Sequence, residues 1–139
     1  MKKIVAAHDG SDASDRALSK AVMIAGQFGA SLQVVSVVPD LHFTETPWKR
    51  ESMHSLCRAE TEGVIELIRE YLADLKADAE TAILQGISPA DAIIEHAKSC
   101  GADLVVVGAT GKQASPKGYI GSVSLRLAAN APCSVLIVR

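Results

Sequence analysis

Aromatic residues are scarce in this sequence, at 4% of its 139 residues, although hydrophobic residues make up 48%. The core must therefore be built mainly from valine, isoleucine, leucine and alanine. That composition is typical of a buried parallel β-sheet covered by helices. A chain of this length can enclose a substantial core within one unit. We expect residues 1–139 to form a single domain.

The sequence also lacks an excess of charge of either sign, since its formal net charge is −2. This balance gives no electrostatic reason to expect a nucleic acid or an anionic membrane as partner. No apolar run approaches the roughly 20 residues of a membrane span, and the run after the two N-terminal lysines is too short for a signal peptide. The three cysteines form no CxxC pair, which argues against a disulfide framework or zinc site and favours the cytoplasm.

Short apolar runs alternate with stretches of helical periodicity along the whole chain. One helix start is especially clear, because Ser88 can cap it, Pro89 suits its first position and Asp91 places negative charge in its first turn. The order βαβαβαβαβ predicts a mostly parallel sheet with right-handed crossovers and helices on both faces. The expected strands are 4–8, 32–38, 80–84, 104–107 and 134–138, and the expected helices are 13–28, about 51–76, 89–100 and 121 to about 130.

Between the second strand and the second helix, residues 41–49 show no clear period and are expected to form a loop. The helix that follows is the longest, and its apolar residues predict one buried face. These residues are Met53, Leu56, Cys57, Val64, Ile65, Ile68, Leu72 and Leu75.

Ligands of open parallel sheets bind beyond the carboxyl ends of the strands, where the strand order reverses. In this chain His8–Ser11 follows the first strand and Gly108–Gly111 follows the fourth. Glycines there let backbone N–H groups approach a phosphate. The run Gly121–Ser124 then opens the last helix, whose N-terminus favours anions. These residues predict an anion site, although they could equally form an ordinary turn and helix cap.

Two familiar phosphate-binding motifs are missing. A Walker A loop requires serine or threonine after Gly-Lys, but Gly111-Lys112 is followed by Gln113. The dinucleotide fingerprint GxGxxG is absent after the first strand, where only Gly10 is present. A P-loop NTPase or a nicotinamide enzyme is therefore not expected.

The glycine spacing is similar to another motif. Gly108, Gly111 and Gly121-Ser122 are separated by two and nine residues, which is the G-x2-G-x9-G-[S/T] pattern of the ATP-binding universal stress proteins. Residues 4–11, 34–38, 101–108 and 131–138 also resemble the strands and turns of that family, so the resemblance covers the whole chain. It implies a three-layer α/β/α sandwich of the Rossmann-like type, with a five-stranded parallel sheet in the order 3-2-1-4-5.

The resemblance also implies which residues bind ATP. The residues at the phosphates and ribose would be Gly108, Gly111, Gly121, Ser122, Val123 and Ser124, and those near the adenosine end would be Ala7, Asp9, Val37 and Val107. Asp9 would hydrogen-bond the nucleoside or help hold Mg²⁺, and capping of the turn at Gly10 is an equal alternative. The segment Lys112–Ile120 departs from the usual family composition, which bears on nucleotide affinity.

As a function, the resemblance implies a cytoplasmic ATP-binding module of the stress response, whose bound state is sensed by partners. It also implies a homodimer formed through the last strand, Val135–Val138. The alternative is a slow ATPase or autophosphorylating protein with Ser122 or Ser124 as acceptor. No residue is expected to be catalytic under the first interpretation. A third possibility, a dimer that acts without nucleotide, is disfavoured by the complete glycine spacing.

Overall fold

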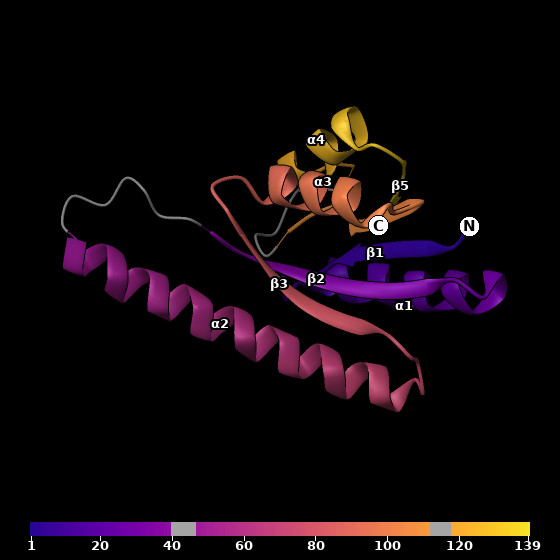
Figure 1. Cartoon of the computed structure of the whole chain (residues 1–139), viewed down its shortest axis with the longest axis horizontal. Coiled ribbons are helices and arrows are strands. Elements are labelled where there is room, and N and C mark those ends of the chain that lie inside the picture. Colours follow the sequence, from indigo (N-terminus) through magenta and orange to yellow (C-terminus); the bar gives the residue numbers. More distant parts are fainter. Residues whose placement is uncertain (40–46, 112–117) are drawn as a thin grey trace.

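The computed structural model describes residues 1–39, 47–111 and 118–139, in which five strands alternate with four helices (Figure 1). All neighbouring strands are parallel, and their order is β3-β2-β1-β4-β5. The predicted fold class and strand order are thus confirmed. The strands are β1 (Lys3–Ala7), β2 (Ser31–Pro39), β3 (Glu80–Gly86), β4 (Leu104–Gly108) and β5 (Ser134–Val138), and the helices are α1 (Asp12–Phe28), α2 (Pro47–Asp74), α3 (Pro89–Cys100) and α4 (Ser122–Asn130).

Two hydrophobic cores lie on the two faces of the sheet. Successive side chains of a strand point to opposite faces, so Ile4 of β1 packs with α1 and α2, whereas its neighbour Val5 packs with α3 and α4. Figure 1 shows α3 and α4 together on one side of the strands. The central strands β1 and β4 are therefore buried on both faces, as their continuous apolar sequence requires.

Helix ends follow the signals in the sequence. The Ser88 hydroxyl accepts a hydrogen bond from the Asp91 N–H at the start of α3, and Pro89 occupies the first turn. Gly29 and Gly101 end α1 and α3 with φ angles of 62° and 68°, in the left-handed region that favours glycine. These caps set where the chain turns back toward the sheet.

An exposed carboxylate lies at the amino ends of the strands, opposite the predicted ligand site at their carboxyl ends. Asp103 precedes β4, and its Oδ2 accepts hydrogen bonds from the backbone N–H groups of Lys2 and Lys3, at 2.7 and 2.8 Å. These bonds to the ionised form lower the pKa of Asp103 from its ordinary value. The carboxylate thereby attaches the N-terminus of the chain to β4.

Helix α2 begins at Pro47, so the predicted loop 41–49 is wrong for residues 47–49, and residues 40–46 lie outside the described part of the chain. Proline is well suited to the first turn of a helix because its missing N–H has no intrahelical partner there. The helix is 28 residues long. Across the described residues, no helix combines the length and apolar character needed to cross a membrane.

The predicted buried face of α2 is correct only for part of the helix. Ile65, Ile68 and Leu72 are buried, whereas Met53 and Leu56 are 44% and 71% exposed. Figure 1 gives the reason, since the N-terminal half of α2 extends past the strands. Leu75 follows the last helical residue and is 43% exposed, which also contradicts the prediction.

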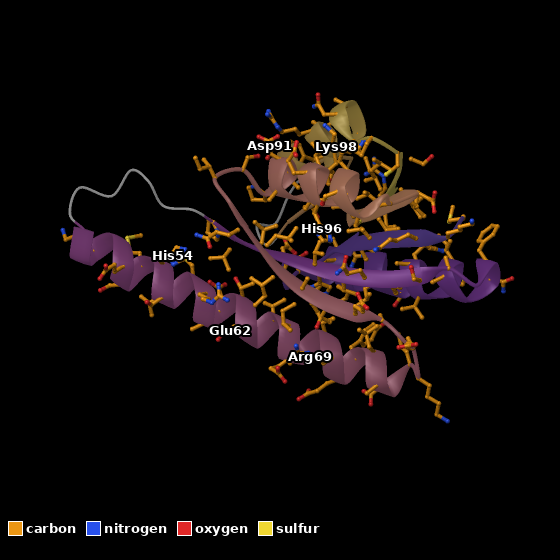
Figure 2. All side chains as sticks on the ribbon, in the orientation of Figure 1. His54, Glu62, Arg69, Asp91, His96 and Lys98 are labelled. Atoms are coloured by element: carbon orange, nitrogen blue, oxygen red, sulfur yellow. The ribbon has the colours of Figure 1, made fainter. Side chains whose placement is uncertain are left out.

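The N-terminal half of α2 nevertheless makes a polar contact with the sheet. His54 Nε2 lies 2.9 Å from Gln85 Nε2 of β3. Figure 2 shows His54 on this half of the helix, with Glu62 and Arg69 farther toward its C-terminus. The ion pairs Arg58–Glu62 and Glu66–Arg69 lie on exposed positions, in agreement with a solvated outer face.

Candidate functional site

The turn after β1 is organised by Asp9. Its Oδ1 accepts hydrogen bonds from the Ser11 N–H at 2.9 Å and from the Ser14 hydroxyl at 3.0 Å. Gly10 has a φ of 88°, which a side chain would disfavour. The capping role considered for Asp9 is therefore present. Its other oxygen, Oδ2, lies toward Gly111, where an added Cβ would be 3.1 Å away.

His8 is buried directly before this carboxylate and has partners for both ring nitrogens. The Gly10 N–H donates to Nδ1 at 3.1 Å, so Nε2 carries the proton and donates to Asp15 Oδ1 at 2.8 Å. The His8 carbonyl accepts from the buried Ser36 hydroxyl at 2.7 Å. These bonds hold β1, β2 and α1 in a fixed arrangement around the strand ends.

Gly108 ends β4 where α1 approaches most closely. A Cβ at this position would lie 2.8 Å from the carbonyl carbon of Ala13 and 2.9 Å from its Cβ. The Gly108 carbonyl accepts a 2.6 Å hydrogen bond from the hydroxyl of Ser124, which is only 3% exposed. Gly108 is therefore required by the packing of α1, and the Ser124 hydroxyl joins β4 to α4.

The N-terminus of α4 differs from those of α1 and α3. Its N-cap residue is Gly121, which supplies no side-chain cap, whereas Ser11 and Ser88 cap the other two helices. The first-turn N–H groups of a helix carry a partial positive charge and need partners. Gly121 has a φ of −67°, and a Cβ would be 3.4 Å from the Ala109 oxygen. Neither the backbone nor packing therefore requires glycine here.

These elements surround a cavity of about 460 Å³ at the carboxyl ends of β1, β2 and β4. Its volume falls within the range of small-molecule sites. The cavity brings together all ten residues predicted from the sequence to bind nucleotide. They are Ala7, Asp9, Val37, Val107, Gly108, Gly111, Gly121, Ser122, Val123 and Ser124.

Charged groups are few in the described lining. Asp9 is the only carboxylate among these lining residues. In the described part of the chain, no group of three or more His, Cys, Asp or Glu side chains is arranged to hold a metal ion. Lys112 and Lys117 of the atypical segment lie outside the described residues, whereas Tyr119 lines the cavity. The described walls thus combine apolar side chains, hydroxyls and a helix N-terminus.

The model of the universal stress protein family matches residues 1–139. The chain belongs to this family. It is 35% identical over 146 residues to the universal stress protein YxiE of Bacillus subtilis, covering 99% of this chain and 98% of that protein. The universal stress protein UspA from Lactobacillus plantarum has a similar structure, with a TM-score of 0.89, 29% identity and coverage of 99% and 97%. A universal stress protein in complex with cAMP is also similar, with a TM-score of 0.74, 27% identity and the same coverages.

Two walls of the cavity in this universal stress protein were not predicted from its sequence. Thr61 and Val64 come from α2, and Pro89 and Ile93 come from the start of α3. They belong to no ligand-binding motif: Pro89 was assigned only to a helix start, and helical periodicity indicated only that Val64 and Ile93 face inward. The remaining lining residues outside the predicted set are His8, Ser14, Val35, Ser36, Thr110 and Tyr119. Several of them adjoin predicted residues in the sequence, which was the available signal.

Proposed function

We propose that this chain binds ATP together with Mg²⁺ in the cavity at the strand ends. Residues 1–139 would act as one cytoplasmic domain whose nucleotide state regulates a stress response. The observation that carries the proposal is the convergence on one cavity of β1, β2, β4 and α4 residues that were selected from the sequence by their family resemblance. The cAMP complex of a 27% identical family member supports an adenine nucleotide as the ligand class.

The phosphate end of the site would be the uncapped start of α4. Its first-turn N–H groups offer donors and a partial positive charge, which suit a polyphosphate. Ser122 is exposed beside them and adds a hydroxyl. Packing within the protein does not require glycine at 121. A ligand that approaches the backbone closely would explain the glycine, which supports this assignment. Gly111 would contribute similarly beside Asp9.

The nucleoside end would lie over β1 and β2. Ala7, Val37 and Val107 line the cavity there, and apolar walls of this kind suit the faces of a purine ring. The Asp9 carboxylate adjoins Gly111, where an added Cβ would lie 3.1 Å from Oδ2. Its Oδ1 already accepts from the Ser11 N–H, and the Ser14 hydroxyl shares its proton between Oδ1 and the Ser11 carbonyl, so a ligand would meet Oδ2.

The residues present also fit Mg²⁺ as a companion of the nucleotide. Mg²⁺ in nucleotide sites keeps several waters and uses one or two carboxylates together with the phosphates, and Asp9 Oδ2 can provide one such oxygen. When bound, Mg²⁺ neutralises phosphate charge. The contribution of this chain would be to hold the Asp9 carboxylate through the Ser11 N–H and the Ser14 hydroxyl.

The alternative of slow phosphoryl transfer is favoured by one observation, the exposure of Ser122 at the cavity. Transfer of the γ-phosphoryl group to the Ser122 Oγ would release ADP and the hydroxyl proton. Ser124 suits this role less well because its hydroxyl donates to the Gly108 carbonyl. Incubation with ATP and Mg²⁺ followed by peptide mass spectrometry distinguishes the two functions. Phosphate on Ser122, lost in Ser122→Ala, supports transfer, and an unmodified protein supports binding alone.

We also propose that β5 pairs with a second copy of the chain. β5 lies at the edge of the sheet, and its residues Val135–Val138 are only partly buried. An apolar edge strand presents unpaired backbone groups that favour pairing. Sedimentation velocity at micromolar concentration should give a dimer. A monomer under these conditions would contradict the pairing.

Calorimetric titration with ATP and Mg²⁺ tests the binding proposal, using two matched glycine substitutions. A methyl group at Gly121 would enter the proposed phosphate site, so Gly121→Ala should weaken ATP binding by about tenfold or more. Gly63 lies on the exposed side of α2 with no atoms near an added Cβ, and Gly63→Ala should leave the affinity unchanged. Absence of ATP binding by the wild-type protein would overturn the proposal.

A further inference from the structure

Thr61 of α2 lines the cavity although it is only 8% exposed. Its hydroxyl donates a 2.8 Å hydrogen bond to the carbonyl of Cys57, one helical turn earlier. A hydroxyl has a single hydrogen, so the Thr61 oxygen can only accept a further bond. While the Thr61 hydroxyl keeps its bond to Cys57, it offers a ligand only an acceptor.

A second hydroxyl of the cavity, that of Ser36, is committed in the same way. It lines the cavity from β2, is buried, and donates to the His8 carbonyl at 2.7 Å. Val64 of α2 adds an apolar wall on this face of the sheet, and Val35 and Val37 line the cavity from the opposite face. This end of the cavity thus combines an apolar surface with side-chain oxygens whose protons are already used.

The position of Thr61 places it far from the proposed phosphate site. Helix α2 packs against β2 and β3, and β2 is separated from β4 by β1. Strands are about 4.8 Å apart, so β2 and β4 lie roughly 10 Å apart. Figure 1 shows α2 on the far side of the sheet from α4. A nucleotide with its phosphates at α4 would extend along the strand ends and present its base to β2 and α2.

We infer that Thr61 is a specificity-determining residue that selects a base with an exocyclic amine. This inference rests on the proposed binding of ATP in the same cavity. The 6-amino group of adenine is a donor and can meet the Thr61 oxygen. The 6-oxo group of hypoxanthine or guanine is an acceptor, and while the Thr61 hydroxyl donates to Cys57 it would leave two oxygens facing each other without a proton. A buried polar group that cannot be paired gives strong discrimination.

A purely structural role for Thr61 makes a different prediction. In that case its hydroxyl only makes the hydrogen bond to Cys57 within the helix. Removing it would change the stability of the protein without changing the preference for one base over another. The ratio of affinities for ATP and inosine triphosphate therefore separates the two roles. These two ligands differ both in the group at position 6 and in the protonation of the adjacent ring nitrogen. Purine riboside triphosphate differs from ATP only in lacking the amine, so it is the third ligand.

The experiment measures the Kd of all three nucleotides with Mg²⁺ for the wild type, Thr61→Val and Thr61→Ser. The wild type should bind ATP about tenfold more tightly than inosine triphosphate. It should bind ATP about three- to tenfold more tightly than purine riboside triphosphate. Valine has nearly the shape of threonine without the oxygen, so Thr61→Val should reduce both ratios to near one. Thr61→Ser retains the acceptor and should preserve them.

The outcomes distinguish this inference from the function on which it rests. If the wild type binds no ATP, the proposed function fails and the inference fails with it. If the wild type binds ATP but Thr61→Val keeps the wild-type ratios, or the wild type binds the three nucleotides equally, only the role of Thr61 is overturned. Circular dichroism and thermal melting of each variant verify that the measured ratios come from folded protein. Preserved ratios in Thr61→Ser would provide the decisive support.

Discussion

Replacing Gly108 with alanine tests the reason for the first glycine of the motif. The new Cβ would lie 2.8 Å from the carbonyl carbon of Ala13 and 3.0 Å from its oxygen. Because these are backbone atoms, α1 and β4 would have to separate. Overpacking of this kind lowers the free energy of unfolding by about 1–3 kcal/mol. An unfolding entropy of about 2.1 cal/mol/K per residue, taken over 139 residues, converts this loss to a Tm decrease of about 3–10 °C.

Urea denaturation followed by circular dichroism measures this loss, with Gly121→Ala as the matched control. At Gly121 the added Cβ would meet its nearest atom at 3.4 Å, which is an ordinary contact. Alanine restricts the unfolded chain but caps a helix less well than glycine, so the two effects oppose each other and this control should change the free energy of unfolding by less than about 1 kcal/mol. If Gly108→Ala unfolds at the same urea concentration as the wild type, the close approach of α1 does not require glycine at this position.

Three further predictions concern packing, capping and pH. Leu72→Ala should lower the free energy of unfolding by about 2–5 kcal/mol, whereas Leu56→Ala on the exposed half of α2 should change it by less than about 0.5 kcal/mol; equal losses in urea denaturation would contradict the placement of α2. Ser11→Ala should cost about 1 kcal/mol through loss of the α1 cap, and an unchanged urea midpoint would show that this cap contributes nothing. The pKa of Asp103 is lowered in the folded state from its ordinary 3.8, so its stabilisation is present above that pH and lost as the pH falls through the lowered value. Asp103→Asn should therefore be less stable than the wild type at pH 7, with a difference that shrinks below about pH 4; a difference independent of pH would refute this role.

The alternation of strands and helices was readable from the sequence because each element has its own periodicity. The buried strand Leu104–Gly108 is a continuous apolar run, and α3 begins at a serine cap followed by proline. Periodicity could not establish where α2 leaves the sheet, because Leu56 and Ile68 are equally apolar. Only the position of the helix relative to the strands makes Leu56 exposed and Ile68 buried.

The candidate site divides in the same way. Its glycines and the residues after β1 were predictable, because strand ends and helix starts in a parallel sheet must meet at one edge. The reason for each glycine was not predictable from the sequence, since Gly108 faces Ala13 of α1 whereas Gly121 has room for a methyl group. Such differences depend on atoms that are distant in the sequence.

By itself, the sequence determined the family, the parallel sheet and the set of motif residues that line the cavity, because these depend on local patterns and their spacing. The tertiary structure alone decided that Thr61 of α2 lines the same cavity, and that its hydroxyl proton is used by Cys57. A threonine within a helix has no local feature that marks it as part of a site. Its role depends on which strand the helix packs against, and that is a property of the folded chain.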